Sequence, residues 1–262
     1  MTASELSHAA LRFLGLIGFY PSRFLLTNPF KIMEFEAIAR LAEIEHGDKV
    51  LDVGCGTGAQ AMLAARRCSS VVGGDIDSHS VHTARRSSVF SKNSSSVDFI
   101  ISDASALPFV PGSFDKVVSY CVLEHIPKWK QVLRNMHDCL SCGGTLVISV
   151  DSLSLIDDPY LKEKHAREHS VFKYFDGKTL EEALKEAGFD EIVVAQLLTS
   201  ERSRDLFIKG IEKGFNYSLT AAIIEYVLLK INENGGHRQQ EKGLFLIARA
   251  ISKSSLRDKT CN

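Results

Sequence analysis

The sequence has no excess of charge of either sign, no apolar run of membrane length and no leader-like start. Its 31 Lys and Arg residues oppose 32 Asp and Glu residues, which leaves a net charge of −1. General nucleic-acid binders carry a basic excess because they neutralise phosphates, so nucleic acid is not an expected partner. The apolar stretch Leu14–Tyr20 stops at Pro21, far short of the roughly 20 residues of a transmembrane helix. The first eleven residues contain no Lys or Arg, so we expect no secretory leader and a cytoplasmic protein.

Cysteine is present, but not in the pattern of a disulfide scaffold or a zinc site. Six cysteines in 262 residues, several of them in segments that look buried, are typical of free thiols in a reducing compartment. Cys139 and Cys142 have C-x-x-C spacing, but they close a predicted helix, whereas a redox pair opens one. The sequence has no second such pair to complete a zinc site. We therefore expect structural cysteines and no metal.

The elements that are present alternate between strands and helices, as in an α/β protein. Hydrophobic residues make up 45% and charged residues 24%, as in ordinary globular domains. Short links between strands and helices predict right-handed crossovers and a mostly parallel sheet with helices on both faces. The run Thr145-Leu-Val-Ile148 lacks apolar–polar alternation, which indicates a strand covered on both faces. The expected strands are residues 49–53, 70–75, 97–102, 114–120, 145–150, 191–198 and 243–251.

Helices are expected around these strands. Apolar spacing predicts helices near residues 31–45 and 128–140, and Gly188 is a C-cap signal for a helix from Thr179. Ser78 is a plausible N-cap for the helix after the second strand. Residues 151–178 form a long, charged connection in this interpretation. The segment between the last two strands looks helical.

A glycine-rich turn follows the first predicted strand. Gly54, Gly56 and Gly58 join that strand to a helix, where glycine lets the backbone approach a ligand and the helix N-terminus presents free amides. Such a turn alone could also bind a dinucleotide pyrophosphate. The spacing here is G-x-G-x-G, however, and Asp52 stands just before the glycines. That placement suits a cation better than a pyrophosphate.

The segment Asp52-Val-Gly-Cys-Gly-Thr-Gly58 resembles motif I of the class I S-adenosylmethionine (SAM) dependent methyltransferases. Four further stretches match that family in order and spacing, which makes the combination more specific than any one motif. The later stretches are similar to the ubiquinone/menaquinone-methyltransferase-like branch of small-molecule enzymes, with Cys142 where proline is usual. The resemblance covers residues 48–150, and more weakly 172–189 and the last strand. The four stretches are residues 71–77, 102–109, 113–126 and 140–146.

The resemblance implies a Rossmann-like fold with a seven-stranded sheet, N-terminal helices and a helical insert before the last strand. It divides the chain into an N-terminal helical cap (residues 1–46), a SAM-binding core (47–199), the insert (200–241), and the last strand with the tail (242–262). The cofactor is SAM, and S-adenosyl-L-homocysteine is its product.

The resemblance also assigns cofactor contacts. Asp52 would hold the SAM ammonium, directly or through water, and Asp75 would accept from the ribose hydroxyls. Asp103 would accept from the adenine amino group, and the Ala104 amide would donate to the ring. The alternative for Asp75 and Asp103 is a purely structural role, as turn or helix-cap residues. The full set is Asp52, Gly54, Cys55, Gly56, Gly58, Asp75, Ile76, Asp103, Ala104, Tyr120 and Cys121.

Three residues are candidates for catalysis. His125 follows the fourth strand, at the edge where ligands bind in such folds, and could act as a base; the alternative is a structural histidine before Pro127. His169 lies in the connection where this branch often builds its acceptor site. Tyr20 could belong to an N-terminal lid, or be ordinary packing. His165 and His169 have the spacing of metal ligands on a helix, but a solvated helix face is the better interpretation.

The two helical additions bear on the substrate. Both are rich in bulky apolar groups, which predicts a lid over a small apolar or aromatic acceptor; core helices or a homodimer interface are equally compatible. Whether the acceptor atom is oxygen, nitrogen or carbon stays open. Methylation of protein or RNA, and a non-catalytic SAM-fold binding protein, are the alternative functions.

Overall fold

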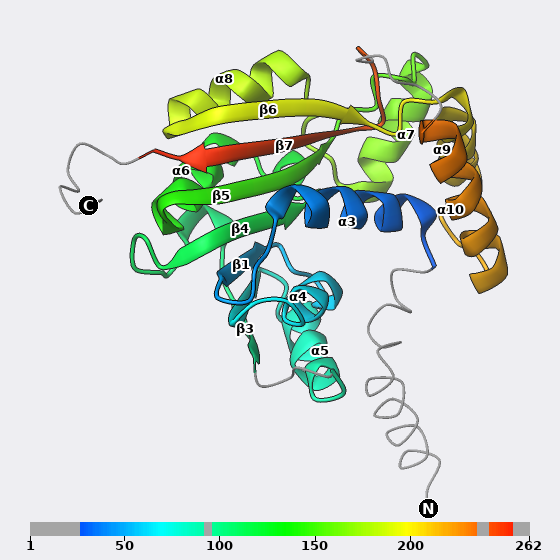
Figure 1. The fold of residues 1–262 in the computed structure, drawn as a ribbon. Coiled ribbons are helices and arrows are strands. Elements are labelled where there is room, and N and C mark those ends of the chain that lie inside the picture. The colour runs from blue at the N-terminus through cyan, green and yellow to red at the C-terminus, as the bar shows by residue number, and fades with distance from the viewer. Residues whose placement is uncertain (1–26, 92–95, 235–240, 254–262) are drawn as a thin grey trace, which may run out of the picture.

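The computed structural model describes residues 27–91, 96–234 and 241–253. Tyr20 and the other N-terminal lid candidates lie outside these residues. A seven-stranded sheet has the order β3-β2-β1-β4-β5-β7-β6 (Figure 1). β7 runs antiparallel to both of its neighbours, and the pairings among β1 to β5 are all parallel. The strands are β1 (Lys49–Val53), β2 (Ser70–Asp75), β3 (Val97–Ile101), β4 (Phe114–Tyr120), β5 (Leu140–Asp151), β6 (Phe189–Leu197) and β7 (Phe245–Ser252).

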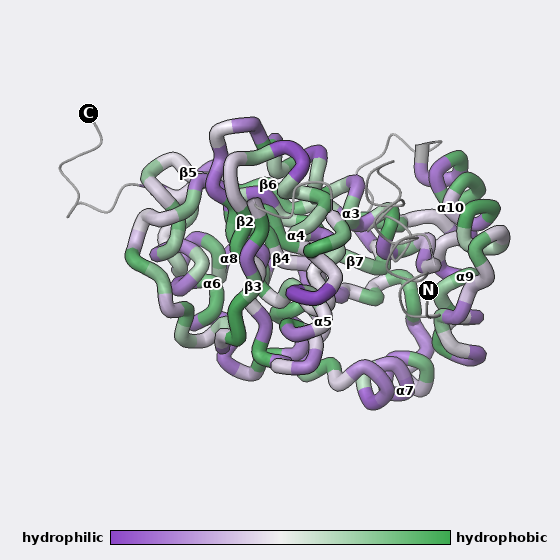
Figure 2. The backbone as a smooth tube through the Cα atoms, turned by 90° about the horizontal axis from the view of Figure 1, so that it is seen from below, coloured by the Kyte–Doolittle hydropathy of each residue, from purple (hydrophilic) through white to green (hydrophobic). Residues whose placement is uncertain are grey.

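Helices cover both faces of the sheet, as the sequence predicts (Figure 1). Helices α3, α4 and α5 pack on one face, and α6 and α8 pack on the other. Each side has its own apolar core, built on strand residues such as Val147 and Ile148 that are fully buried. The hydrophobic strands stand out in the middle of the molecule in Figure 2. The helices are α3 (Pro29–Ala42), α4 (Ala59–Ala64), α5 (Ser78–Ser88), α6 (Trp129–Cys139), α7 (Pro159–His169), α8 (Gly177–Ala187), α9 (Glu201–Lys213) and α10 (Leu219–Asn234).

The connection after β5 contains a helix that the sequence interpretation missed. Helix α7 begins at an Asp158 N-cap, whose side chain accepts from the Tyr160 amide, and Pro159 occupies its first turn. Asp followed by Pro is a helix-start signal, but the charged composition of the segment hid it. The N-cap of α5 is Asp77 and not Ser78, because the Asp77 side chain accepts from the amides of His79 and Ser80.

The insert between β6 and β7 is helical, as predicted, and packs beside the N-terminal end of the described chain. Helix α10 lies along α3 (Figure 1), where the Tyr226 hydroxyl donates to Glu36 at 2.5 Å. The Glu233 carboxylate accepts from the Thr199 and Ser200 amides at 2.8 and 3.0 Å. Through these bonds, α10 ties the insert to α3 and to the segment that follows β6.

The cysteines confirm part of the expectation. Cys55, Cys68, Cys121 and Cys139 are free thiols, and burial raises the pKa of the Cys68 and Cys139 thiols to about 11. Cys142 takes part in a disulfide bond, so the expectation of a free thiol is wrong there. None of the described helices is both long enough and apolar enough to span a bilayer.

The central strand β5 provides a test of the core. Leu146 is fully buried, so Leu146→Ala should lower the free energy of unfolding by about 2–5 kcal/mol through lost burial and a residual cavity. Val193 on the edge strand β6 is 57% exposed, and Val193→Ala should change stability by less than about 0.5 kcal/mol. Urea unfolding followed by circular dichroism measures both; equal effects would contradict this assignment of the core.

Candidate functional site

The glycine turn between β1 and α4 requires glycine for steric reasons. Gly54 and Gly58 have φ angles of 77° and 81°, a region that side chains disfavour. A Cβ atom on Gly54 would lie 2.3 Å from Val122, and one on Gly58 would lie 2.4 Å from Phe99. The Gly54 amide donates to the Gly74 carbonyl at 2.8 Å, which fastens the turn to β2. The turn is thus packed tightly against its neighbours.

Asp75 ends β2 and faces this turn. Its Oδ2 accepts from the Gly56 amide at 2.8 Å, and its Oδ1 accepts from the Asp77 amide at 2.9 Å. Because each carboxylate oxygen can accept more than one hydrogen bond, Asp75 is held in one orientation and can still accept from a ligand. A turn role and a binding role are therefore compatible at this residue.

A cavity of about 620 Å³ opens at the carboxyl ends of β1, β2 and β4. This volume lies within the usual range of small-molecule sites. The cavity gathers many of the predicted cofactor residues, together with His125. Asp52, Cys55, Gly56 and Gly58 do not line it and lie in or beneath the turn. The predicted cofactor residues that line it are Gly54, Asp75, Ile76, Asp103, Ala104, Tyr120 and Cys121.

Asp52 is a fully buried carboxylate beneath the turn. Neither of its oxygens has a well-formed hydrogen bond to the described residues. Burial, and then the negative charge of Asp75, raise the pKa of Asp52 to about 7. A buried carboxylate in this condition is stabilised by a positive group.

Asp103 caps the short helix η2 (Ala104–Ala106) at the cavity rim. Its Oδ1 accepts from the Ser105 amide at 2.7 Å and from the Ser105 hydroxyl at 2.8 Å, and these bonds lower the pKa of Asp103. The Ala104 carbonyl accepts from the Asn135 amide group at 3.0 Å. Asp103 thus has the cap role that the sequence allowed, and it also faces the cavity.

A second cavity, of about 250 Å³, adjoins the first. The two share Cys121 and His125, which line both. The walls of the second cavity come from α3, the end of β4, the end of β5, α7, the insert and β7. They include four phenylalanines and two further histidines: Phe30, Phe207, Phe215, Phe245, His165 and His169.

The predicted catalytic histidines differ in their surroundings. His125 is exposed, and its Nδ1 lies 3.2 Å from the Ser170 carbonyl; a carbonyl only accepts, so this contact places the proton on Nδ1 and leaves Nε2 free to accept. His169 is at the cavity mouth, and burial lowers its pKa. His165 is buried, which makes the solvated-face interpretation wrong for this residue. Its Nδ1 lies 2.9 Å from the Tyr174 hydroxyl.

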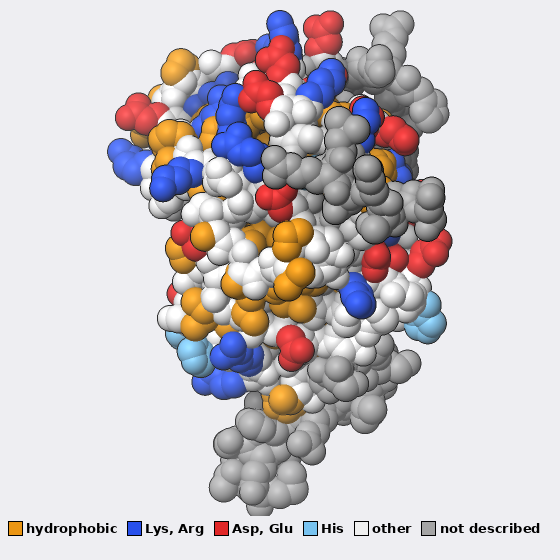
Figure 3. Space-filling model, turned by 90° about the vertical axis from the view of Figure 1, so that its left-hand side faces the viewer, with side chains coloured by type: hydrophobic (Ala, Val, Ile, Leu, Met, Phe, Trp, Pro, Cys, Tyr) orange, Lys and Arg blue, Asp and Glu red, His pale blue; other side chains and the backbone are white. Residues whose placement is uncertain are grey.

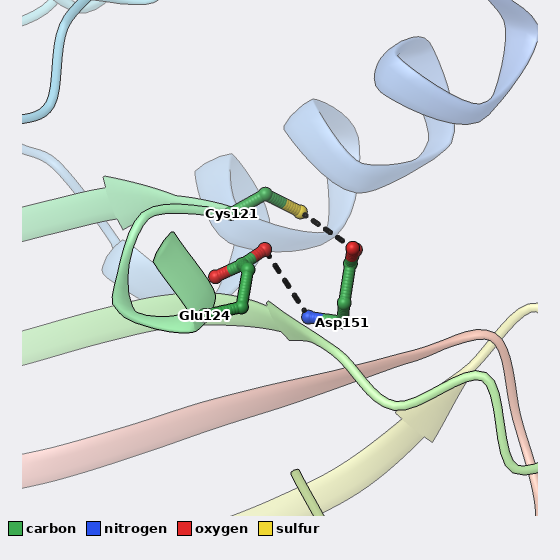
Figure 4. A group of neighbouring side chains, drawn as sticks. All are labelled: Cys121, Glu124 and Asp151. Carbon is green, nitrogen blue, oxygen red and sulfur yellow. Dashed lines mark hydrogen bonds between the residues drawn. The ribbon is translucent and has the colours of Figure 1, made fainter. Parts of the chain in front are cut away.

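A cluster of acidic and thiol groups forms the floor between the cavities (Figure 4). Tyr120 of β4 lies opposite Ser149 of β5 in the sheet. Cys121 comes one residue after Tyr120 and Asp151 two residues after Ser149, so the two side chains come close together. The Cys121 thiol donates to Glu34 at 3.0 Å and lies 3.7 Å from Asp151. Cys121 has a φ angle of 50°, an uncommon conformation that often marks functional positions.

Burial sets the acidity of this cluster. It raises the pKa of Asp151 to about 6, although Lys31 nearby opposes the shift. Burial, followed by the charge of Asp151, raises the pKa of Glu124 well above its usual range. Burial and the Glu34 charge raise the pKa of the Cys121 thiol in the same way. Burial therefore favours the neutral forms of Glu124 and Cys121, whereas Asp151, with a pKa of about 6, is largely ionised near pH 7.

Sequence reasoning missed Lys31, Glu34 and Asp151 as residues of the site. Asp151 ends β5 at the same sheet edge as His125, so the rule that singled out His125 could have found it. Glu34 gave no such signal, because a lone acid on an amphipathic helix usually faces water. Its burial follows from the way α3 crosses the ends of β4 and β5 (Figure 1).

Asp52 provides a pH test. Its pKa of about 7 in the folded protein lies above the ordinary value of 3.8, so ionisation favours the unfolded chain as pH rises from about 4 to about 7. Asp52→Asn should remove this loss, which is on the order of 4 kcal/mol at roughly 1.36 kcal/mol per pKa unit. Urea unfolding from pH 4 to 8 measures the effect. Asp98→Asn, on the exposed side of β3, should keep the wild-type profile; parallel profiles for wild type and Asp52→Asn would contradict the shift.

Comparisons with known proteins agree with this geometry. The family described as "Methyltransferase domain" matches residues 51–148. The chain is 32% identical over 196 residues to the O-methyltransferase cnsE of Penicillium expansum, covering 72% of this chain and 70% of that protein. It is 32% identical over 123 residues to the ubiquinone biosynthesis O-methyltransferase of Pseudomonas aeruginosa, covering 47% of this chain and half of that protein.

The fold also matches solved structures. Phosphoethanolamine N-methyltransferase 2 of Haemonchus contortus, solved in complex with S-adenosyl-L-methionine, superposes with a TM-score of 0.61 at 22% identity, over 84% of this chain and 52% of that one. At this identity the likeness concerns the fold. Together with the family match and the relatives, it leads to one conclusion: the chain belongs to the class I SAM-dependent methyltransferases.

Proposed function

We propose that this enzyme transfers the methyl group of SAM to a small apolar or aromatic metabolite. The observation that carries the proposal is the junction of two cavities at Cys121 and His125. The larger cavity is lined by the motif residues expected at a SAM site. The smaller one has four phenylalanines in its wall and space for a small molecule only. Donor and acceptor would therefore meet at the junction.

The residues in the wall of the larger cavity and beneath it fit SAM. The buried Asp52 carboxylate lacks a well-formed hydrogen bond, so an ammonium brought near it, directly or through water, would be favourable. Asp75 is held by backbone amides and can accept from two vicinal hydroxyls. Asp103 and Ala104 line the part of the cavity where we place the adenine. Gly54, which lines the cavity, lets the backbone approach the ligand, and Gly56 and Gly58 shape the turn beneath it.

SAM, when bound, supplies an already activated methyl group, so positioning of donor and acceptor accounts for much of the rate. The chain contributes by lining the smaller cavity with residues of α3 and the insert, which reduces the access of water on that side. His125 could accept a proton through Nε2, because its Nδ1 faces the Ser170 carbonyl. His169, at the mouth of the smaller cavity, is better placed to contact the acceptor than to act as a base.

The insert supports the predicted lid. Phe207 of α9 and Phe215, just after it, reach the smaller cavity, and their rings pack with centroids 5.0 Å apart. Phe30 of α3 contacts Phe207 edge-on at 5.1 Å. The insert and α3 thus share an aromatic wall over the acceptor position. We retain the division into residues 1–46, 47–199, 200–241 and 242–262 as a prediction.

The alternative functions have less support. On the face seen in Figure 3, Lys and Arg side chains are interspersed with Asp and Glu, whereas an RNA-binding surface gathers basic groups. A smaller cavity of about 250 Å³ suits a small acceptor better than a protein segment. A non-catalytic SAM-fold binding protein needs no second cavity beside the first. We also propose a cytoplasmic location, which the four free thiols support and the disulfide bond of Cys142 does not; a homodimer stays a prediction.

The cofactor assignment predicts the effect of Asp75→Ala. Loss of a charged hydrogen-bond acceptor costs about 1.5–3 kcal/mol, so the Kd for SAM should rise tenfold or more in isothermal titration. Asp98→Ala, which removes an exposed carboxylate from the neighbouring strand β3, is the matched control and should leave the Kd unchanged. Equal affinities of wild type and Asp75→Ala would overturn the assignment.

The substrate class predicts where a transferred methyl group appears. The protein is incubated with methyl-tritiated SAM in three separate reactions. One contains the small-molecule fraction of a cell extract, one the protein fraction and one the RNA fraction. Label should enter the small-molecule fraction and partition into organic solvent, because the acceptor cavity is largely apolar. Label in protein or RNA would contradict the proposal, and SAM binding without any transfer would favour the non-catalytic alternative.

A further inference from the structure

The smaller cavity carries more negative than positive groups. Three carboxylates, those of Glu34, Glu124 and Asp151, are buried in or beside its wall, and Lys31 is the cationic partner. Lys31 Nζ lies 2.8 Å from Glu34 Oε2. The other Glu34 oxygen accepts from the Cys121 thiol and the Ser149 hydroxyl. Glu34 is thus fully engaged by this chain's own groups.

Glu124 and Asp151 have no such partner. Glu124 Oε1 accepts from the Asp151 amide at 3.3 Å, while its Oε2 is buried without a hydrogen bond from the described residues. Asp151 has the Cys121 thiol 3.7 Å away as its side-chain partner. No ion pair joins either carboxylate to a Lys, Arg or His of the described chain. Two buried carboxylates, drawn in Figure 4, therefore line the smaller cavity without an ion-pair partner of their own, although Lys31, which pairs with Glu34, is close enough to oppose the rise in the pKa of both.

Two of the three imidazoles in the wall do not supply that charge; the third, His125, is exposed and contacts the Ser170 carbonyl. Burial lowers the pKa of His165 to about 3, and it lowers the pKa of His169 as well. Both rings are therefore neutral near pH 7. An anionic acceptor would meet two buried carboxylates there, which makes phosphate or carboxylate groups unfavourable at this position.

The four phenylalanines that line the same cavity suit a cation with an apolar body. The Phe207 ring lies 5.1 Å from Phe30, 5.0 Å from Phe215 and 5.8 Å from Phe245, centroid to centroid. Aromatic faces attract ammonium groups, most strongly when water is excluded. Lys31 Nζ already lies 5.9 Å from the centroid of Phe245, so an ammonium is accommodated beside this wall.

We propose that the acceptor is a primary or secondary amine on an apolar or aromatic body, bound as the ammonium between the Glu124–Asp151 carboxylates and the phenylalanine wall, and methylated on nitrogen. The proposal rests on the function proposed above. It deepens that function by choosing nitrogen among the possible acceptor atoms.

The transfer balances with groups at the junction. One ammonium N–H bond breaks, and its proton passes to the Asp151 carboxylate as an O–H bond forms. The nitrogen lone pair that is freed forms the new N–C bond as the S–C bond of SAM breaks, and the S–C electron pair stays on sulfur. The products are the methylated ammonium, S-adenosyl-L-homocysteine and protonated Asp151, which returns its proton to solvent.

The first experiment uses wild-type protein saturated with S-adenosyl-L-homocysteine. Isothermal titration compares matched amine, alcohol and carboxylate probes on three bodies: phenylethyl, indolylethyl and octyl. On at least one body, the amine should bind at least about tenfold more tightly than its alcohol, and the carboxylate should bind most weakly. Equal or tighter binding of the alcohol or carboxylate on all three bodies, or no binding of any amine, would overturn the proposal.

Variants locate the preference. Asp151→Asn and Glu124→Gln should each reduce amine affinity about tenfold or more while leaving alcohol affinity within about threefold. Asp157→Asn is the matched control, because Asp157 lies outside the cavity, is 85% exposed and pairs with Lys242. An unchanged amine preference in both cavity variants would contradict the proposal. If either variant fails to fold by circular dichroism, the wild-type probe series still decides.

Two readouts separate the possible failures. SAM titration on the same protein tests the proposed function by itself: bound SAM without an amine preference rejects only the present inference, and absent SAM binding rejects both.

A divalent metal is the competing occupant of the acidic cluster, since Cys121, Glu124 and Asp151 place ligand atoms within 4.8 Å of one another. Tight Zn²⁺ or Mg²⁺ binding that Asp151→Asn abolishes and that excludes the amine would also overturn it.

Discussion

The buried carboxylate of Glu34 is the interaction on which the site depends. It reaches from α3 across the carboxyl ends of β4 and β5, where it accepts from Cys121 and Ser149 and pairs with Lys31. A buried carboxylate needs such partners, because burial without them is costly. The contact fixes α3 over the sheet edge, and with it the roof of the smaller cavity. The insert then packs on α3 and completes the enclosure.

Each of the two cavities has a buried carboxylate beside or beneath it that a positive group would stabilise. Beneath the glycine turn, Asp52 is a buried carboxylate without a well-formed hydrogen bond, and beyond Cys121 one oxygen of the buried Glu124 carboxylate, Oε2, is in the same condition. Burial raises the pKa of each of these groups. Each carboxylate is therefore stabilised when a positive group arrives. Charge, more than the number of contacts, would then select what enters each cavity, while the apolar walls select shape.

The sequence predicted the parts of the structure that follow from local rules. The strand and helix alternation, the glycine turn and the acid that ends β2 all depend on neighbours close in the chain, so their positions are confirmed, while the cofactor-binding roles of the turn and the acid stay predictions. Helix α7 was missed because its charged composition concealed the Asp158–Pro159 start. Glu34 was missed, and His165 was wrongly placed on a solvated helix face, because the burial of both depends on contacts far along the chain. Asp151 could have been found, since it ends a strand at the same edge as His125.

The central claim is that donor and acceptor meet at Cys121 and His125, with the acceptor nitrogen held by Asp151. A crystal structure with S-adenosyl-L-homocysteine and a bound arylalkyl amine tests this most directly. The account predicts the cofactor sulfur at the junction, with the amine nitrogen within about 3–4 Å of the position that a methyl group on that sulfur would occupy. The same nitrogen should lie within hydrogen-bond distance of Asp151. A sulfur that points away from the smaller cavity, or an amine bound elsewhere, would contradict it.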